Sequence, residues 1–326
     1  MQTYILRRIV LGIPTIFAVA ILVFFLVRAT PGDIASQILA ESQGANDPEF
    51  AQRIREDLGL TGSVFTQLGR YLGDIVQLDF GESYGGARSV LEDIGNRFPA
   101  SFEFAVITIL VGVIVGIPVG IVAALRQDTW IDYVLRGGTV LILAIPSFFL
   151  ALWLIIFGIN QFGLNWGFLD WTPQAKYFEI WDQPLKNLKM IGIPATILGI
   201  NLAAIYARYV RTTMLEVMRQ DYIRTAMAKG LHERGVILRH ALKNALIPVV
   251  TVVGLTLAGV ITGVVVLELI FGIPGLGRLF IQAALRRDYP IVQGVVILAS
   301  VIVIVTNLLV DLSYGVLDPR VRESLR

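Results

Sequence analysis

The sequence predicts an all-α integral membrane protein with six transmembrane helices, and three observations support this fold class. Of the 326 residues, 55% are hydrophobic and only 16% are charged, whereas soluble domains carry about 25% charged residues. The mean hydropathy is +0.71. Six apolar runs, separated by polar or basic segments, approach or exceed the length of about 20 residues that a helix needs to cross a bilayer.

The first apolar run follows Arg7 and Arg8 and covers residues 9–27 without a charge. It is longer than the core of a signal peptide, and no cleavage site of small residues precedes the polar turn at residues 30–33. We therefore expect residues 1–28 to form an uncleaved first span whose N-terminus lies in the cytoplasm.

Residues 29–98 form a polar section that holds most of the acidic residues of the first half of the chain. Apolar side chains recur at helical spacing in two parts of it, residues 48–58 and 64–76. These stripes are too apolar for a disordered linker. We expect a small extracytoplasmic subdomain between the first and second spans, packed on the membrane part.

Residues 99–326 hold five further apolar runs and are expected to form a five-helix permease core. The runs cover about residues 101–125, 134–157, 190–209, 245–271 and 291–316. The first of them carries Gly112, Gly116 and Gly120 at a spacing of four residues. Small residues allow helices in a membrane to approach closely, so we favour tight packing here over a hinge.

The loop at 210–247 is the longest polar interruption of this core. Apolar residues recur at helical spacing on both sides of Gly230, which indicates two short helices joined by a turn. From residue 208 to 243 there are eight Lys and Arg against three acidic residues, and such a basic loop is expected on the cytoplasmic side. The resulting topology places 15 of the 27 Lys and Arg residues, and both termini, in the cytoplasm.

The chain shows few groups that could perform chemistry. It has no Cys, and its only two His residues, His232 and His240, lie in the central loop. No serine-hydrolase, zinc-protease or phosphate-loop motif is present. The net charge of +2 is too small to suggest nucleic-acid binding.

Ionisable and polar residues at membrane depth are candidates for function because they are costly there. We select Asn201, Glu268 and Asp311 as candidates for a translocation path or gate. The alternative for Glu268 and Asp311 is that each reaches a membrane interface or an Arg partner. These facts favour a transporter or channel subunit over a membrane enzyme, and they allow the basic loop to lie on anionic lipid.

From residue 225 the loop reads TAMAKGLHERGVILRHALKNALIP. This segment resembles the cytoplasmic "EAA" loop of ATP-binding-cassette importer permeases, in the version of the dipeptide, oligopeptide and nickel permease group. The resemblance continues, in order and over nearly the entire chain, with YILRRIVLGIPT, PGD, DFGESY, GIPVGIVAALRQDTWID, AIPSFFLAL, ELIFGIPGLGRLF, RDYPIVQG and LDPRVR.

The resemblance implies the type I ABC importer permease fold and a permease subunit of an ATP-driven, binding-protein-dependent importer. Di- or oligopeptides are the expected substrates, with nickel or glutathione as alternatives. The implied partners are a second homologous permease, two ATP-binding-cassette ATPase subunits, an extracytoplasmic substrate-binding protein and membrane lipid. The chain would hold no cofactor, because ATP and Mg are bound by the ATPase subunits.

The implied location is the bacterial or archaeal cell (inner) membrane, with both termini in the cytoplasm. Two other classes stay open: a channel or scaffold that works without ATPases, and a membrane-embedded enzyme. The first predicts that no ATPase subunit co-purifies with the chain. The second predicts an activity of the isolated chain that is lost when Glu268 or Asp311 is replaced.

In such importers the loop forms a coupling helix that docks on an ATPase subunit. By position, Gly230 matches the Gly of the motif, Ala226 its second Ala and Leu242 its later Leu. The resemblance implies six coupling residues: Thr225, Ala226, Lys229, Gly230, Leu231 and Leu242. Three positions depart from the general motif: Arg224, Thr225 and Lys243.

Overall fold

The computed structural model describes residues 2–29, 49, 52, 53, 56, 61–84, 88–159 and 177–317. In this part of the chain the regular elements are helices, with one isolated β-bridge between Glu82 and Ser89. The predicted all-α class is confirmed. The described residues contain five helices long and apolar enough to cross a membrane, and two bent pairs raise the number to seven. The six predicted spans lie within this range.

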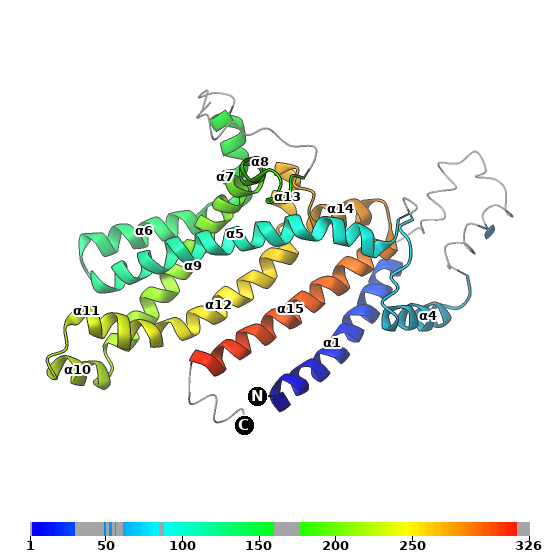
Figure 1. The fold of residues 1–326 in the computed structure, drawn as a ribbon. Coiled ribbons are helices and arrows are strands. Elements are labelled where there is room, and N and C mark those ends of the chain that lie inside the picture. Colours follow the sequence, from blue (N-terminus) through cyan, green and yellow to red (C-terminus); the bar gives the residue numbers. More distant parts are fainter. Residues whose placement is uncertain are drawn as a thin grey trace.

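The long helices run beside one another along much of their length (Figure 1). They are α1 (Gln2–Ala29), α5 (Val90–Leu125), α9 (Ile193–Met218), α12 (Leu242–Gly263) and α15 (Tyr289–Leu317). Helix α5 begins eleven residues before the apolar run from which the second span was predicted, because Ser89 caps it by accepting a hydrogen bond from the N–H of Glu92. The domain boundary predicted at residue 98 therefore falls inside this helix.

Helices α5 and α9 pack closely through the three glycines of α5. A Cβ at Gly116 would lie 2.6 Å from the carbonyl oxygen of Ala203, and a Cβ at Gly120 would lie 2.6 Å from that of Ala207. A Cβ at Gly112 would lie 2.8 Å from the ring of Tyr206. Only glycine allows the two backbones to come this near, so the spacing that predicted tight packing has that role here.

The third predicted span is not one straight helix. It is divided into α6 (Trp130–Ala144) and α7 (Ser147–Trp153), which meet at an angle of 84°. Pro146 lies at the break and, because it has no N–H, cannot continue the hydrogen bonding of α6. Its carbonyl oxygen instead accepts hydrogen bonds from the N–H groups of Phe149 and Leu150 at 3.0 and 3.2 Å, which starts α7.

The fifth predicted span also ends earlier than expected. Helix α12 stops at Gly263, and α13 (Val265–Phe271) and α14 (Leu276–Leu285) then form a second bent pair with an angle of 91°. Gly272 ends α13 in the left-handed conformation, with φ at +68°, which favours glycine. Helix α14 was not among the predicted elements.

The N-terminal end of α1 and the C-terminal end of α15 lie near each other, on the side of the molecule where α10 (Asp221–Ala228) and α11 (Glu233–Val236) lie (Figure 1). Arg8 of α1 and Asp311 of α15 form an ion pair at 2.9 Å there. At the other end of α1, Arg28 donates hydrogen bonds to the side-chain oxygen of Gln67 in α4 (Val64–Val76) at 3.0 and 3.2 Å. The section between the first two long helices is thus attached to the C-terminal end of α1.

Helix α4 has the bounds that the apolar stripe predicted. Ser63 begins it by accepting a hydrogen bond from the N–H of Thr66 at 3.2 Å. Of the predicted stripe, Ile75 is buried against α1 and α15, whereas Phe65 is 78% exposed. The second predicted helix of this section, residues 48–58, lies almost wholly outside the described residues.

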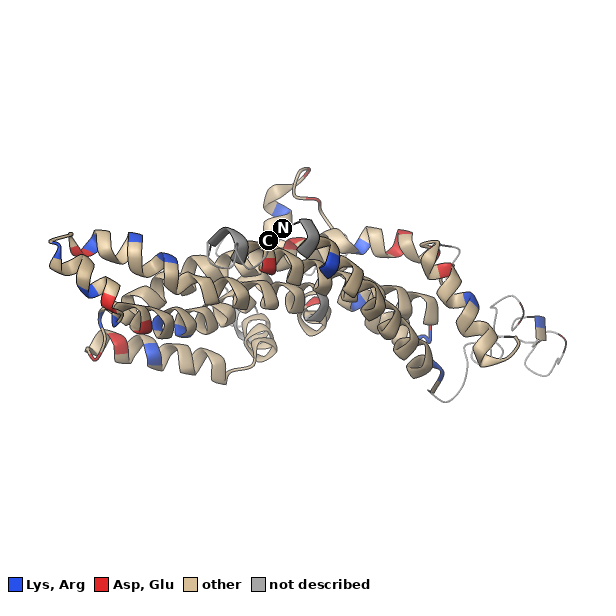
Figure 2. Cartoon of the chain, turned by 90° about the horizontal axis from the view of Figure 1, so that it is seen from below, with Lys and Arg blue, Asp and Glu red and all other residues tan. Residues whose placement is uncertain are grey.

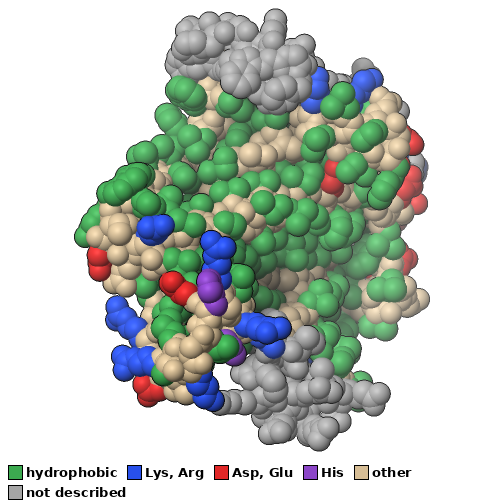
Figure 3. Space-filling view, turned by 60° about the vertical axis from the view of Figure 1, so that its left-hand side comes forward, with side chains coloured by type: hydrophobic (Ala, Val, Ile, Leu, Met, Phe, Trp, Pro, Cys, Tyr) green, Lys and Arg blue, Asp and Glu red, His purple; other side chains and the backbone are tan. Residues whose placement is uncertain are grey.

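The surface between the two ends is mostly apolar. Figure 2 shows long stretches of the helices without charge, with Lys and Arg gathered toward their ends. Large apolar side chains such as Ile114 and Val140 are 67% and 66% exposed. Figure 3 shows this apolar face, with both His residues and several Lys and Arg residues at one corner. Such a surface suits a lipid environment or the apolar face of another membrane helix.

Candidate functional site

The loop between α9 and α12 contains the two short helices that the sequence predicted. Helix α10 ends at Lys229 and Gly230, where the N–H of Lys229 donates to the carbonyl of Thr225 at 3.1 Å. Gly230 has φ at +78°, the conformation that commonly follows a helix end. No atom lies within 4 Å of the position that a Cβ of Gly230 would take. Glycine is therefore favoured here by its positive φ, and not because a neighbouring atom would clash with a side chain.

His232 begins the second short helix. Its Nδ1 accepts a hydrogen bond from the N–H of Arg234 at 3.2 Å. Its carbonyl accepts from Gly235 and Val236. From there the chain passes through a π-helical turn, residues Ile237–Ala241, into α12. The loop is thus joined to the membrane helix without a flexible break.

The inner face of the loop is packed against the ends of α9 and α12. Ile223 of α10, Val236 of α11 and Ala241 are fully buried, and Ala226 is 9% exposed. They form one apolar cluster with five buried residues of the long helices: Ala124 of α5, Val210 and Met214 of α9, and Ala245 and Val249 of α12. Burying a side chain as large as Ile contributes about 1.5–3 kcal/mol, so the cluster holds α10 and α11 as one unit with these helix ends.

A polar contact adds to this attachment. Asn244 of α12 donates a 3.0 Å hydrogen bond to the hydroxyl of Tyr222 in α10, across 22 residues of the chain. The same amide nitrogen also donates to the carbonyl of His240 at 2.9 Å. A displacement of α10 must therefore either break these contacts or move the end of α12 with it.

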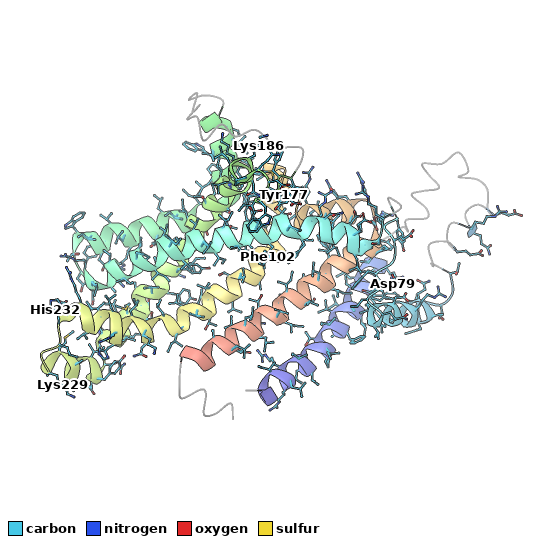
Figure 4. The ribbon with its side chains drawn as sticks, viewed as in Figure 1. Asp79, Phe102, Tyr177, Lys186, Lys229 and His232 are labelled. Atoms are coloured by element: carbon cyan, nitrogen blue, oxygen red, sulfur yellow. The ribbon has the colours of Figure 1, made fainter. Side chains whose placement is uncertain are left out.

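The outer face of the loop combines apolar and basic side chains. Met227, Leu231 and Leu238 are 42%, 49% and 64% exposed, and Lys229 and Arg234 are exposed beside them. Figure 4 shows Lys229 and His232 at the end of the loop that points away from the long helices. The α10–α11 loop thus exposes apolar residues among cations on one side, while its other side is packed on the long helices. Such a surface is typical of one that binds another protein.

The structure divides the six predicted coupling residues into two groups. Thr225, Lys229, Gly230 and Leu231 are exposed, and the hydroxyl of Thr225 donates to the carbonyl of Asp221 at 2.9 Å. Ala226 and Leu242 face the apolar cluster instead. Four of the six thus lie on the exposed side of the loop, and the other two pack on its buried side.

The three residues selected for a path or gate are held by separate partners. Asn201 of α9 donates to the carbonyl of Ile142 in α6 at 3.4 Å, and Asp311 pairs with Arg8 as described above. Glu268 of α13 is 2% exposed and accepts a hydrogen bond from the hydroxyl of Ser101 in α5 at 2.6 Å. They do not form one cluster, and each links two different helices.

Glu268 also organises the second bent pair. Its other carboxylate oxygen accepts the N–H of Arg278 in the first turn of α14 at 2.8 Å, a position where a negative charge is stabilised. The hydroxyl of Ser101 accepts the N–H of Leu276 at 2.8 Å. A Cβ at Gly275, the second glycine of the GIPGLG stretch, would overlap the Glu268 carboxylate. Glycine at this position therefore leaves room for the carboxylate.

Two polar contacts were missed by the sequence reasoning. Asp132, at the start of α6, is completely buried and receives two hydrogen bonds from Arg211 of α9, at 2.8 and 2.7 Å. On the opposite side of the protein, Glu103 of α5 accepts from Tyr177 at 2.6 Å and from Asn187 at 2.9 Å. Burial and the neighbouring Glu103 raise the pKa of Tyr177. Asp132 and Arg211 lie 79 residues apart, and their charges alone did not reveal the pairing.

Metal ligands are not gathered anywhere in the described part of the chain. No group of three or more His, Cys, Asp or Glu residues with a suitable arrangement occurs among these residues.

Comparison with known proteins agrees with this geometry. Residues 116–323 match the family described as "Binding-protein-dependent transport system inner membrane component", and residues 1–105 match the N-terminal component of such systems. The dipeptide transport system permease protein DppB of Haemophilus influenzae is 38% identical, over 99% of this chain and all of the relative. DppB of Escherichia coli is 37% identical over 99% of both chains, and DppB of Bacillus subtilis is 38% identical over 99% and 98%. The chain belongs to the family of binding-protein-dependent transport system inner membrane components and has its type I ABC permease fold.

Proposed function

We propose that this chain is the membrane permease subunit of an importer for di- or oligopeptides, working by alternating access. Its family makes it a transport component whose energy comes from separate ATPases. Three relatives of almost equal length are named as dipeptide transport permeases, which supports peptides as substrates. A substrate-binding protein outside, a second homologous permease and two ATPase subunits would complete the transporter.

The observation that carries the proposal is the fixed loop between α9 and α12. Its buried inner face joins it to both helices, and its outer face presents Leu231 and Lys229 to a partner. A force applied to this outer face by an ATPase would be transmitted to α9 and α12 through the apolar cluster and the contact between Tyr222 and Asn244. We therefore assign ATPase coupling to Thr225, Ala226, Lys229, Gly230, Leu231 and Leu242.

We propose Asn201, Glu268 and Asp311 as gate positions rather than as substrate ligands. Each makes a contact between two helices. Movement of the helices between inward-open and outward-open states would break or replace such contacts, and this is how gate residues act.

A pair of glycine substitutions tests the coupling role. In the assembled transporter, Gly230→Val would place a β-branched residue at φ +78° and distort the turn. Gly235→Val is the matched control, because it lies in the same loop, also has open space around it and does not have positive φ. The measurement is ATPase activity with and without peptide and binding protein.

We expect Gly230→Val to lose most of the substrate stimulation and Gly235→Val to keep it. Equal stimulation and equal peptide uptake in both variants would rule out a coupling role for the turn. Uptake of labelled dipeptide by the unmodified transporter, competed by unlabelled peptides of increasing length, tests the substrate class separately.

A further inference from the structure

A groove of about 240 Å³ opens between α5, α6 and α9. Its walls include Val119 of α5 and Leu135 and Val140 of α6. Its charged groups are three arginines, Arg136 of α6 and Arg208 and Arg211 of α9, and two threonines also line it. Val140 is 66% exposed, so this apolar wall continues onto the outer surface of the protein. The groove is separate from the outer face of the α10–α11 loop.

The groove carries an excess of positive charge. Arg211 is neutralised by Asp132, to which its Nε and one terminal nitrogen donate. The side chains of Arg136 and Arg208 form no hydrogen bond or ion pair with any residue of the described structure, and no acidic residue of that structure lines the groove. Asp132, whose oxygens are bound by Arg211, also attracts Arg136, so these two arginines share one carboxylate. Two guanidinium groups are therefore available to an anion.

The side chains around the groove indicate that it lies at the level of the membrane surface. Trp130 and Tyr133, in the first turn of α6, are 73% and 59% exposed, and exposed aromatic residues are enriched where a helix enters the headgroup region. Arg136 follows about one turn later, and Val140, a further turn along the same side of α6, is an exposed apolar residue. Cations at this depth direct their charged ends toward the headgroups.

We propose that this groove binds the phosphate headgroup of an anionic phospholipid. Arg136 and Arg208 would contact the phosphate, since guanidinium groups match its oxygens in pairs, and the acyl chains would lie along the apolar wall of α6. Basic pockets between membrane helices suit such headgroups. Assigning the lipid to the cytoplasmic leaflet depends on the proposed topology, but the existence of the site does not.

Lipid retention by the assembled transporter tests the site. The complex would be stripped of lipid in detergent, titrated with dioleoyl phosphatidylglycerol or dioleoyl phosphatidylcholine, and its bound lipids counted by native mass spectrometry. The variants are Arg208→Gln and the double variant Arg136→Gln with Arg208→Gln. Arg126→Gln is the control, because Arg126 is exposed at the end of α5 next to the groove but does not line it.

We expect tight retention of phosphatidylglycerol over phosphatidylcholine, weakened about fivefold by Arg208→Gln and about 30-fold by the double variant. Arg126→Gln should retain the lipid. Equal retention by all variants, or of both lipids, would overturn the proposal. Displacement of the lipid by an equal concentration of inorganic phosphate would identify a free-anion site instead.

If the lipid-free complex takes up no phosphatidylglycerol because a partner subunit covers the groove, the proposal also fails. Retention is measured without ATP, so this result is independent of the coupling test. A coupling failure with normal lipid retention would contradict only the proposed function.

Discussion

Glu268 and Ser101 join α13 to α5 through a 2.6 Å hydrogen bond in which both side chains are buried. The Ser101 hydroxyl has a second task, since it accepts the N–H of Leu276 at the start of α14. One small side chain thus connects three helices at the bend between α13 and α14. Removing it would leave both a carboxylate oxygen and a backbone N–H without this partner.

We expect Ser101→Ala to destabilise the protein by about 1–3 kcal/mol, the cost of leaving buried polar groups unsatisfied. The destabilisation would be measured as a lower midpoint of thermal unfolding in detergent, with loss of the monodisperse peak as the readout. Ser300→Ala is the control, because its hydroxyl only donates to the carbonyl of Val296 within α15. If the two variants melt at the same temperature, the bend does not depend on Ser101.

Asp132 and Arg211 provide a second test of buried polar contacts. Replacing Asp132 by Ala would leave Arg211, whose side chain is only 19% exposed, without its counter-ion, and breaking such a pair costs about 3–5 kcal/mol. We expect a marked fall in the midpoint of thermal unfolding. Asp182→Asn, at an exposed position that makes no hydrogen bond or ion pair with Arg211, should have little effect.

A similar midpoint for the two aspartate variants would mean that solvent reaches Arg211 after the substitution. Arg211→Gln should still lower the midpoint in that case, because it leaves the carboxylate of Asp132, which is completely buried, without its counter-ion.

The sequence allowed some elements to be predicted well because their information is local. The apolar stripe predicts α4 at its observed bounds, and Gly230 between two helical patterns predicts the turn of the loop. The uncharged runs predict the long helices because a helix that crosses a bilayer must be both long and apolar.

The elements that were missed depend on contacts between distant parts of the chain. Apolar composition predicts membrane helices at residues 134–157 and 245–271. It does not predict that the first bends by 84° or that the second is followed, after a bend of 91°, by α14. The pairing of Asp132 with Arg211 depends on the packing of α6 on α9, and the pairing of Glu268 with Ser101 on that of α13 on α5. The coupling positions came from a motif, which indicated a role but not that Ala226 and Leu242 face inward.

The packing of α5 on α9 can be tested at a single glycine. Gly116→Ala would put a methyl group 2.6 Å from the carbonyl of Ala203, so the helices must separate, at a cost of about 1–3 kcal/mol. Gly137→Ala in α6 is the matched control, because nothing lies within 4 Å of the added methyl. That control should be neutral or stabilising by up to about 1 kcal/mol, since Ala favours a helix over Gly.

The midpoints of thermal unfolding of the two glycine variants should therefore shift in opposite directions, or the shift for Gly116→Ala should be clearly larger. Equal destabilisation would show that α5 and α9 can separate without loss, and the three glycines would then need another explanation.

The proposed topology places the α10–α11 loop in the cytoplasm and α4 outside, and the absence of Cys from the sequence makes this simple to measure. Lys229→Cys and Arg70→Cys each introduce one thiol at an exposed position, the first in the loop and the second on α4. A membrane-impermeant maleimide applied to intact cells should label the α4 position, while the loop position should react only in inverted vesicles. Because α10 and α4 lie at opposite ends of the long helices (Figure 1), labelling of both thiols from the same side would contradict the topology, and the coupling role of the loop with it.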